Sequence, residues 1–172
     1  RRFITLGVCF MLLLSCVPYS VLSAVAEDKV QLTNLPTIYI TLDNGAEQSE
    51  ITKDGPQLPG TCSLVGEGIE ELSELPITIK GRGNSTWTLP KKPYQIKFDE
   101  KVDVLGMGEA KKWILLANYW DKTLMRNFIT YNLALKMGLD YTTQCQFVDV
   151  VINGKYQGNY LLTEKVELGG QR

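Results

Sequence analysis

Residues 80–97, with the sequence KGRGNSTWTLPKKPYQIK, bring together groups that could bind a phosphorylated ligand. Gly81 and Gly83 carry no Cβ, so the backbone N–H groups of a loop around them can turn toward a ligand. Short polar side chains and five cations lie in the same stretch: Asn84, Ser85, Thr86, Lys80, Arg82, Lys91, Lys92 and Lys97. A loop of N–H donors flanked by cations provides what a polyphosphate needs.

The spacing of these residues leaves a second interpretation open. Neither a complete GxGxxG motif nor a GxxxxGK(S/T) motif is present, so the stretch is also typical of a basic, glycine-containing hairpin loop on a protein surface. The choice between the two depends on the elements that position the loop and its lysines.

The strand predicted at 94–98 places one lysine favourably. Tyr94, Ile96 and Phe98 alternate with Gln95 and Lys97, so the two sets face opposite sides of the strand. Lys97 can therefore reach a ligand while its neighbours fill the core, and we predict that it contacts phosphate, with Lys92 as the alternative. The alternative is that either lysine is only a solvent-exposed residue of an edge strand, where lysine is common.

A helix is predicted over 122–137, capped by Asp121 at its start and by Gly138 in a left-handed conformation at its end. Its apolar residues share one face and are expected to be core: Leu124, Phe128, Tyr131 and Leu135. Arg126 lies on the other side. It is either a solvated surface arginine or a cation at the cleft, and we predict the second.

Residues 148–164 predict a β-hairpin. Asn153-Gly154 between two runs rich in strand-forming residues is the signal of a type I′ turn. Gly158 within the second strand indicates a bulge or a close backbone approach.

The fold class predicted from these elements is α+β. A mostly antiparallel sheet with one principal helix packed against it follows from short connections and a single long helix. The strands are expected at 35–42, 75–80, 94–98, 113–117, 148–152 and 156–163, with plausible short strands near Ile51 and over 62–65.

The composition excludes several classes of function. The chain has no histidine and no CxxC motif, which removes the usual zinc sites and every Ser–His or Cys–His catalytic arrangement. Setting aside Arg1 and Arg2 leaves 16 Lys and Arg residues against 19 Asp and Glu residues, a formal net charge of about −3, which argues against nonspecific nucleic-acid binding. Whether Cys62 and Cys145 pair is left open.

The first 26 residues read as a signal peptide. An apolar run follows Arg1-Arg2, and Ala24-Val25-Ala26 is a small-x-small cleavage pattern, so a secreted or cell-surface protein is expected. Two alternatives remain: a lipoprotein anchored through Cys16, and an uncleaved anchor, for which Pro18 and three serines make a poor span.

Four motifs in succession carry a family resemblance: GRGNSTW (81–87), KKPY (91–94), KKWILLANYWDKTLMRN (111–127) and NGKYQGNYLLTE (153–164). In this order they resemble the CotH kinase family, the atypical protein kinases similar to spore coat protein H. The resemblance implies that residues 27–172 are the amino-terminal part of a CotH kinase-like domain, whose carboxy-terminal part is missing. That part would carry the metal-binding aspartates, so the chain alone is expected to be inactive.

The resemblance also implies a fold like the nucleotide-binding half of an atypical protein kinase, with ATP and Mg²⁺ as cofactors. The acceptor would be a Ser or Thr hydroxyl of a partner protein, such as a coat or cell-surface protein. Glu164 would lie where a kinase passes into its hinge. The expected nucleotide-binding residues are Gly81, Arg82, Gly83, Asn84, Ser85, Lys92, Lys97, Arg126 and Glu164.

A noncatalytic secreted or cell-surface module that binds a protein or glycan is the alternative. Trp87 and Trp120 could stack on sugars, whereas Trp113 is expected in the core. An exposed Trp87–Trp120 pair would favour this binding module.

Overall fold

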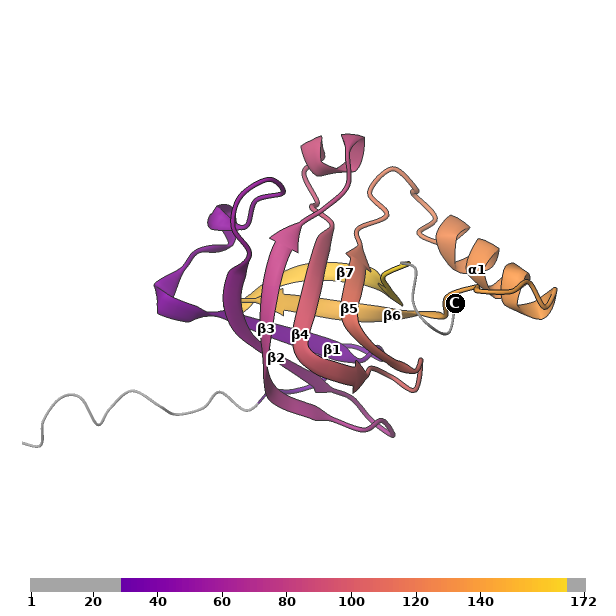
Figure 1. The fold of residues 1–172 in the computed structure, drawn as a ribbon, viewed down its shortest axis with the longest axis horizontal. Coiled ribbons are helices and arrows are strands. Elements are labelled where there is room, and N and C mark those ends of the chain that lie inside the picture. Colours follow the sequence, from indigo (N-terminus) through magenta and orange to yellow (C-terminus); the bar gives the residue numbers. More distant parts are fainter. Residues whose placement is uncertain (1–28, 167–172) are drawn as a thin grey trace, which may run out of the picture.

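Seven strands close into a barrel in the computed structural model, which describes residues 29–166 (Figure 1). Their order around the barrel is β1-β2-β3-β4-β5-β7-β6, and β1 pairs with β6 to close it. That closing pair is parallel, and the other pairs are antiparallel. The strands are β1 (Thr37–Leu42), β2 (Leu58–Val65), β3 (Leu72–Gly81), β4 (Tyr94–Asp103), β5 (Glu109–Leu116), β6 (Cys145–Ile152) and β7 (Lys155–Glu164).

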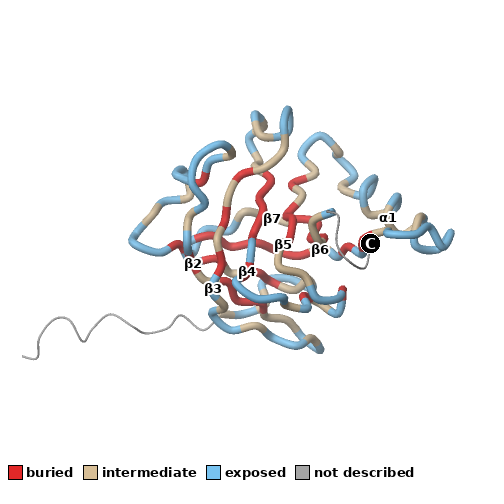
Figure 2. Tube along the Cα trace, in the orientation of Figure 1, coloured by how far each residue is buried: buried red, intermediate tan, exposed pale blue. Residues whose placement is uncertain are grey.

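The core lies inside the barrel, because alternate side chains of each strand point inward. Trp113 is completely buried there, as the sequence predicts. Figure 2 shows the buried residues concentrated along the strands and the exposed ones in the connections. The largest fully buried side chains come from all seven strands: Ile38, Ile40, Leu64, Ile79, Tyr94, Ile96, Phe98, Trp113, Leu115, Ile152, Tyr160 and Leu161.

The prediction of an α+β fold resembling the nucleotide-binding half of a kinase is wrong. The six main expected strands exist and none forms near Ile51, but β2 spans Leu58–Val65 and pairs with both β1 and β3. Together with the parallel β1–β6 pair, β2 closes the sheet on itself. The core therefore forms between the walls of the barrel, and no helix is required to cover it.

The helix α1 (Arg126–Lys136) lies at one end of the barrel and has no buried residue (Figure 1). Its main tie to the sheet is Phe128, whose ring stacks on Phe147 of β6 at 5.0 Å between centroids. Ile129 and Leu133 are each 55% exposed. The expectation of a helix whose apolar stripe packs into the core is therefore wrong. The left-handed Gly138 just after the helix is confirmed by its φ of 67°.

The β6–β7 hairpin is confirmed in detail. Asn153 and Gly154 both have positive φ, 48° and 73°, as a type I′ turn requires. The pairing of β6 with β7 shifts register between Val150, opposite Gly158, and Val151, so the predicted bulge is present. The Asn153 side chain also accepts a hydrogen bond from the Leu42 N–H at 2.9 Å, which ties the turn to the end of β1.

The two cysteines that follow the predicted signal peptide are both buried and free, so Cys62 and Cys145 do not form a disulfide. Burial raises the pKa of Cys62 to about 12. Within residues 29–166 no helix is long and apolar enough to span a membrane. The predicted signal peptide and its alternatives fall on residues 1–26, outside the described part of the chain.

Substituting Gly60→Ala tests the close contact between β1 and β2. A Cβ at Gly60 would lie 2.4 Å from the backbone oxygen of Thr41, so the two strands would have to move apart. We expect a loss of about 1–3 kcal/mol in the free energy of unfolding, measured by urea denaturation. Thr61→Ala, one residue along the same strand, is the control and should cost less than about 1 kcal/mol. Equal stability of both variants would contradict this close packing.

Candidate functional site

Four cations lie on the outer side of β3, β4 and β5, and we call this set the basic face: Lys80, Arg82, Lys97 and Lys112. The register places Lys97 directly opposite Lys112, and Lys80 opposite Gln95, two residues before Lys97. Because Ile79, Ile96 and Trp113 point into the core, these lysines must point outward. Arg82 continues the same alternation just past β3, where its N–H donates to the Pro93 carbonyl at 3.2 Å.

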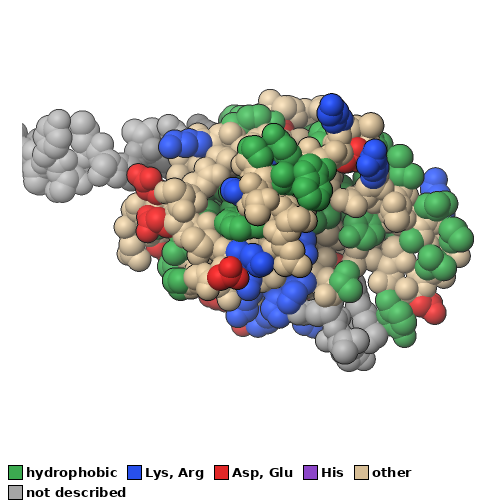
Figure 3. All heavy atoms as spheres, turned by 90° about the horizontal axis from the view of Figure 1, so that it is seen from above, with side chains coloured by type: hydrophobic (Ala, Val, Ile, Leu, Met, Phe, Trp, Pro, Cys, Tyr) green, Lys and Arg blue, Asp and Glu red, His purple; other side chains and the backbone are tan. Residues whose placement is uncertain are grey.

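Like charges on directly opposed strands repel each other. A sheet that places Lys97 across from Lys112, with Lys80 and Arg82 on the same side, therefore concentrates positive charge on one face and favours the approach of an anion. Figure 3 shows Lys and Arg side chains gathered along the edge that faces the viewer in Figure 1.

A cleft of about 230 Å³ adjoins the basic face at Arg82. Arg82 lines it from the loop after β3, and Arg126 lines it from the start of α1. Burial lowers the pKa of Arg82, and the nearby Tyr131 of α1 opposes that effect. Asn118 and Asn127 complete a polar wall, with their side chains hydrogen-bonded to each other at 2.8 Å. The structure thus brings Arg82 and Arg126 to one cleft.

The loop between β3 and β4 is held by internal contacts. Gly81 is required because a Cβ there would lie 2.4 Å from the Trp87 ring, and Gly83 has a φ of 88°. Asn84 accepts a hydrogen bond from Lys53 at 3.2 Å, and the Ser85 carbonyl accepts one from Thr88 in the short turn η4 (Ser85–Thr88). The four predicted loop residues Gly81, Gly83, Asn84 and Ser85 therefore also have structural roles.

The remaining predicted residues lie apart from the cleft. Lys92 donates to the Trp87 carbonyl at 2.7 Å and lines a pocket on the other side of the loop. Lys97 is exposed on β4 and lines neither pocket. Glu164 ends β7 opposite Trp113. Lys112, which sequence reasoning did not select, joins Lys97 on the basic face, and its alternation with Trp113 in the KKWILL run was the available signal.

Lys91 has a structural role beside the cleft. Its ammonium donates to the Asn159 carbonyl and lies 4.4 Å from the centroid of the Tyr160 ring. Burial lowers the pKa of Lys91, and the charge of Asp149 opposes this. The lysine therefore fixes the base of the loop against β7.

Across residues 29–166 no group of three or more His, Cys, Asp or Glu side chains could hold a metal ion. The carboxylate lining the cleft belongs to Asp121, and it accepts hydrogen bonds from Thr123 and from the Arg126 backbone N–H at 2.8 Å. The N-cap of α1 is Met125 and not Asp121, because the helix begins four residues later than predicted, but the Asp121 carboxylate still accepts a hydrogen bond from the first backbone N–H of the helix.

The tryptophans do not form one sugar-binding platform. Trp120 is 63% exposed and lines the cleft with Arg126. Trp87 lines the pocket on the opposite side of the loop, and its ring packs on Gly81 and edge-on against Tyr94.

The chain is thus a β-barrel domain with a cationic outer face and an arginine-lined cleft. Residues 79–170, more than half of the chain, match the CotH kinase protein family. The protein therefore belongs to the CotH kinase family, as its motifs indicate. No curated protein matches the chain.

Replacing Asp121 with Asn should loosen the first turn of α1. Hydrogen bonds from Thr123 and from the Arg126 backbone lower the pKa of Asp121, so its folded-state pKa lies below the unfolded one. The stabilisation by these hydrogen bonds is therefore present at neutral pH and is lost as the pH falls through the folded-state pKa, which lies below the usual value of about 4. We expect the Arg126 amide resonance in NMR to shift over that range and, at neutral pH, to exchange faster in Asp121→Asn. Asp140→Asn, beyond the helix, is the control. An unchanged Arg126 amide would show that the hydrogen bond to Asp121 is dispensable.

Proposed function

We propose that this domain binds the phosphates of ATP on its basic face, as part of an exported protein kinase that phosphorylates Ser or Thr hydroxyls of a coat or cell-surface protein. Membership of the CotH kinase family supports a kinase-like domain. The nucleotide and the acceptor are proposed from that membership and from the charges described above, and the export is proposed from the signal-peptide pattern of residues 1–26.

One observation carries the proposal: the strand register gathers Lys80, Lys97 and Lys112 on one side of three neighbouring strands. Ammonium groups are point charges that suit a mobile triphosphate, whereas a guanidinium binds phosphate oxygens in pairs. Arg82 lies at the boundary between the basic face and the cleft, so it could contact a phosphate that extends from one to the other.

Cations on the basic face can attract ATP, but this attraction does not by itself accelerate phosphoryl transfer. Cations that hold the phosphates equally in the ground state and the transition state lower the dissociation constant without speeding transfer. Phosphoryl transfer also requires carboxylates that position a metal and the acceptor hydroxyl, and residues 29–166 have no such cluster. We therefore expect this chain to bind ATP weakly and to transfer no phosphate.

An ATP titration by NMR or calorimetry tests the basic face. Lys97→Ala should weaken binding roughly three- to tenfold, because a charge-assisted hydrogen bond contributes on the order of 1 kcal/mol at an exposed site. The matched control is Lys101→Ala, which removes an exposed lysine from the same strand. Affinity should also fall with added salt, since exposed charges are screened.

Two results would contradict this proposal. The first is the absence of any ATP-dependent change at millimolar nucleotide. The second is an equal loss of affinity in Lys97→Ala and Lys101→Ala, since that would show general charge attraction rather than a site on the basic face.

Export is tested by amino-terminal sequencing of the protein recovered outside the cell. A mature chain beginning at Glu27 is expected if residues 1–26 are a cleaved signal peptide. A blocked amino terminus at Cys16 would indicate the lipoprotein alternative. Recovery of the protein only inside the cell, with residues 1–26 retained, would contradict both.

A further inference from the structure

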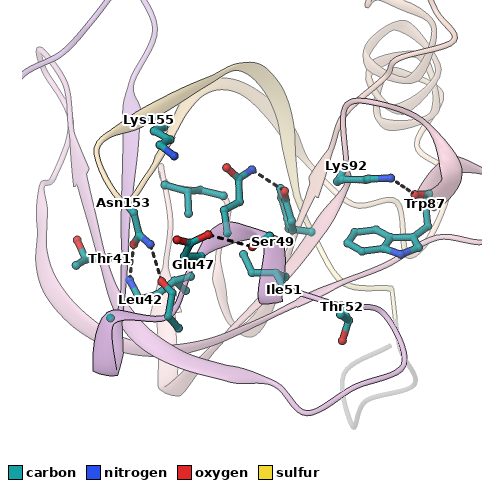
Figure 4. Close-up of a pocket in the computed structure, with 15 residues that line it drawn as sticks. Thr41, Leu42, Glu47, Ser49, Ile51, Thr52, Trp87, Lys92, Asn153 and Lys155 are labelled. Carbon is teal, nitrogen blue, oxygen red and sulfur yellow. Dashed lines mark hydrogen bonds between the residues drawn. The ribbon is translucent and has the colours of Figure 1, made fainter.

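A second pocket of about 910 Å³ lies at the mouth of the barrel (Figure 4). It lies between the end of β1, the turns that follow it, the loop that carries Trp87, and the β6–β7 turn. Pockets of this size in the mouths of β-barrels are common ligand sites. We call it the mouth pocket.

The floor of the mouth pocket is apolar. Leu42, Ile51 and Ile152 are each at least 95% buried and belong to the end of the core. The rings of Tyr94 and Trp87 extend this floor to one side. An apolar group that enters the pocket would therefore be in contact with carbon on several sides.

The polar wall of the pocket is largely satisfied within the protein. Gln48 donates from its Nε2 to both the Tyr94 hydroxyl, at 3.0 Å, and the Gln157 side chain, at 2.7 Å. Asn153 donates to the Ala46 carbonyl at 2.8 Å and accepts from Leu42. These groups hold the shape of the pocket and leave little hydrogen-bonding capacity for a strongly polar ligand.

The charged side chains at the rim of the mouth pocket, unlike the polar groups of its wall, keep hydrogen-bonding capacity for a ligand. The ammonium of Lys155, on the β6–β7 hairpin, has no hydrogen-bond or ion-pair partner among residues 29–166, and Figure 4 shows it at the edge of the pocket. Lys92 makes one hydrogen bond, to the Trp87 carbonyl, and therefore retains two N–H donors. The acidic group at the rim, Glu47, accepts hydrogen bonds from Ser49 and from the Glu50 backbone within its own turn.

An apolar floor with the ammonium of Lys155, unpaired among the described residues, at its rim favours one class of ligand. We propose that the mouth pocket binds an amphipathic organic anion, a carboxylate with an apolar chain or ring. The apolar part would cover Ile51 and Ile152, and the carboxylate would lie toward Lys155, since Figure 4 shows Lys92 on the far side of the pocket with its ammonium turned to the Trp87 carbonyl. A neutral ligand would leave Lys155 unused, and a fully hydrophilic one would desolvate the floor without filling it.

The mouth pocket is independent of the ATP site proposed above. The loop between β3 and β4 separates the two: Trp87 and Lys92 line the mouth pocket, whereas Arg82 and Lys91 line the cleft on its other side. Failure of ATP binding would therefore leave this inference untouched.

Octanoate and its neutral analogue octanamide are the probes, each added to the full chain and followed by NMR. Octanoate should shift the indole N–H of Trp87 and leave those of Trp113 and Trp120 in place, since Trp113 is in the core and Trp120 lines the cleft. Octanamide should bind at least about fivefold more weakly, because it lacks the charge that pairs with Lys155. Lys155→Glu should weaken octanoate by roughly five- to tenfold and leave octanamide nearly unchanged.

Ser49→Trp, at an exposed position on the pocket wall, should block both probes while thermal unfolding shows an intact fold. Lys136→Glu, on α1 away from the pocket, is the control for net charge. The proposal is overturned if octanoate fails to shift Trp87, if octanamide binds as tightly as octanoate, or if Lys155→Glu has no effect. Displacement of octanoate by ATP would also overturn it, because the pocket would then belong to the nucleotide.

Discussion

The parallel pairing of β1 with β6 closes the sheet, and the rest of the domain depends on that pairing. Four residue pairs form it, from Thr37 opposite Asp149 to Ile40 opposite Ile152. The Asp149 carboxylate is buried at this seam and accepts hydrogen bonds from the hydroxyls of Thr33 and Tyr156, at 2.6 and 2.7 Å. A buried carboxylate that is satisfied in this way holds the seam in register, whereas an unpaired one would destabilise it.

Closure divides the side chains into two sets. Inward residues such as Ile79, Ile96 and Trp113 fill the barrel, so their neighbours along each strand lie on its outer side. The same geometry that buries these residues therefore gathers the lysines of three strands on one face. It also leaves α1 without a place in the core, which explains why Ile129 and Leu133 stay exposed.

The loop between β3 and β4 is the second organising feature, because its two sides line two different pockets. Its base is fixed where the Tyr160 hydroxyl donates to the Lys92 carbonyl at 2.9 Å and where Lys91 reaches Asn159. Above that base, Trp87 packs inward on Gly81 and Arg82 turns outward. Glycine at position 81 is thus explained by the space that the indole needs, and a ligand is not required to account for it.

Local patterns in the sequence determined the strands, the turn between β6 and β7, and the family of this protein. Alternation placed Lys97 on the outer side of β4, Asn153-Gly154 fixed the type I′ turn, and the order of four motifs identified the CotH kinase family. These signals are local because they depend on side-chain period or on backbone angles at single residues. The tertiary structure decided the rest. It closes the barrel through β2 and the β1–β6 pair, and it leaves α1 outside that barrel. It also brings Arg82 and Arg126 to one cleft, which Lys92 and Lys97 do not line. Pairing between strands more than a hundred residues apart is set by how the whole core fills, and no local pattern encodes it.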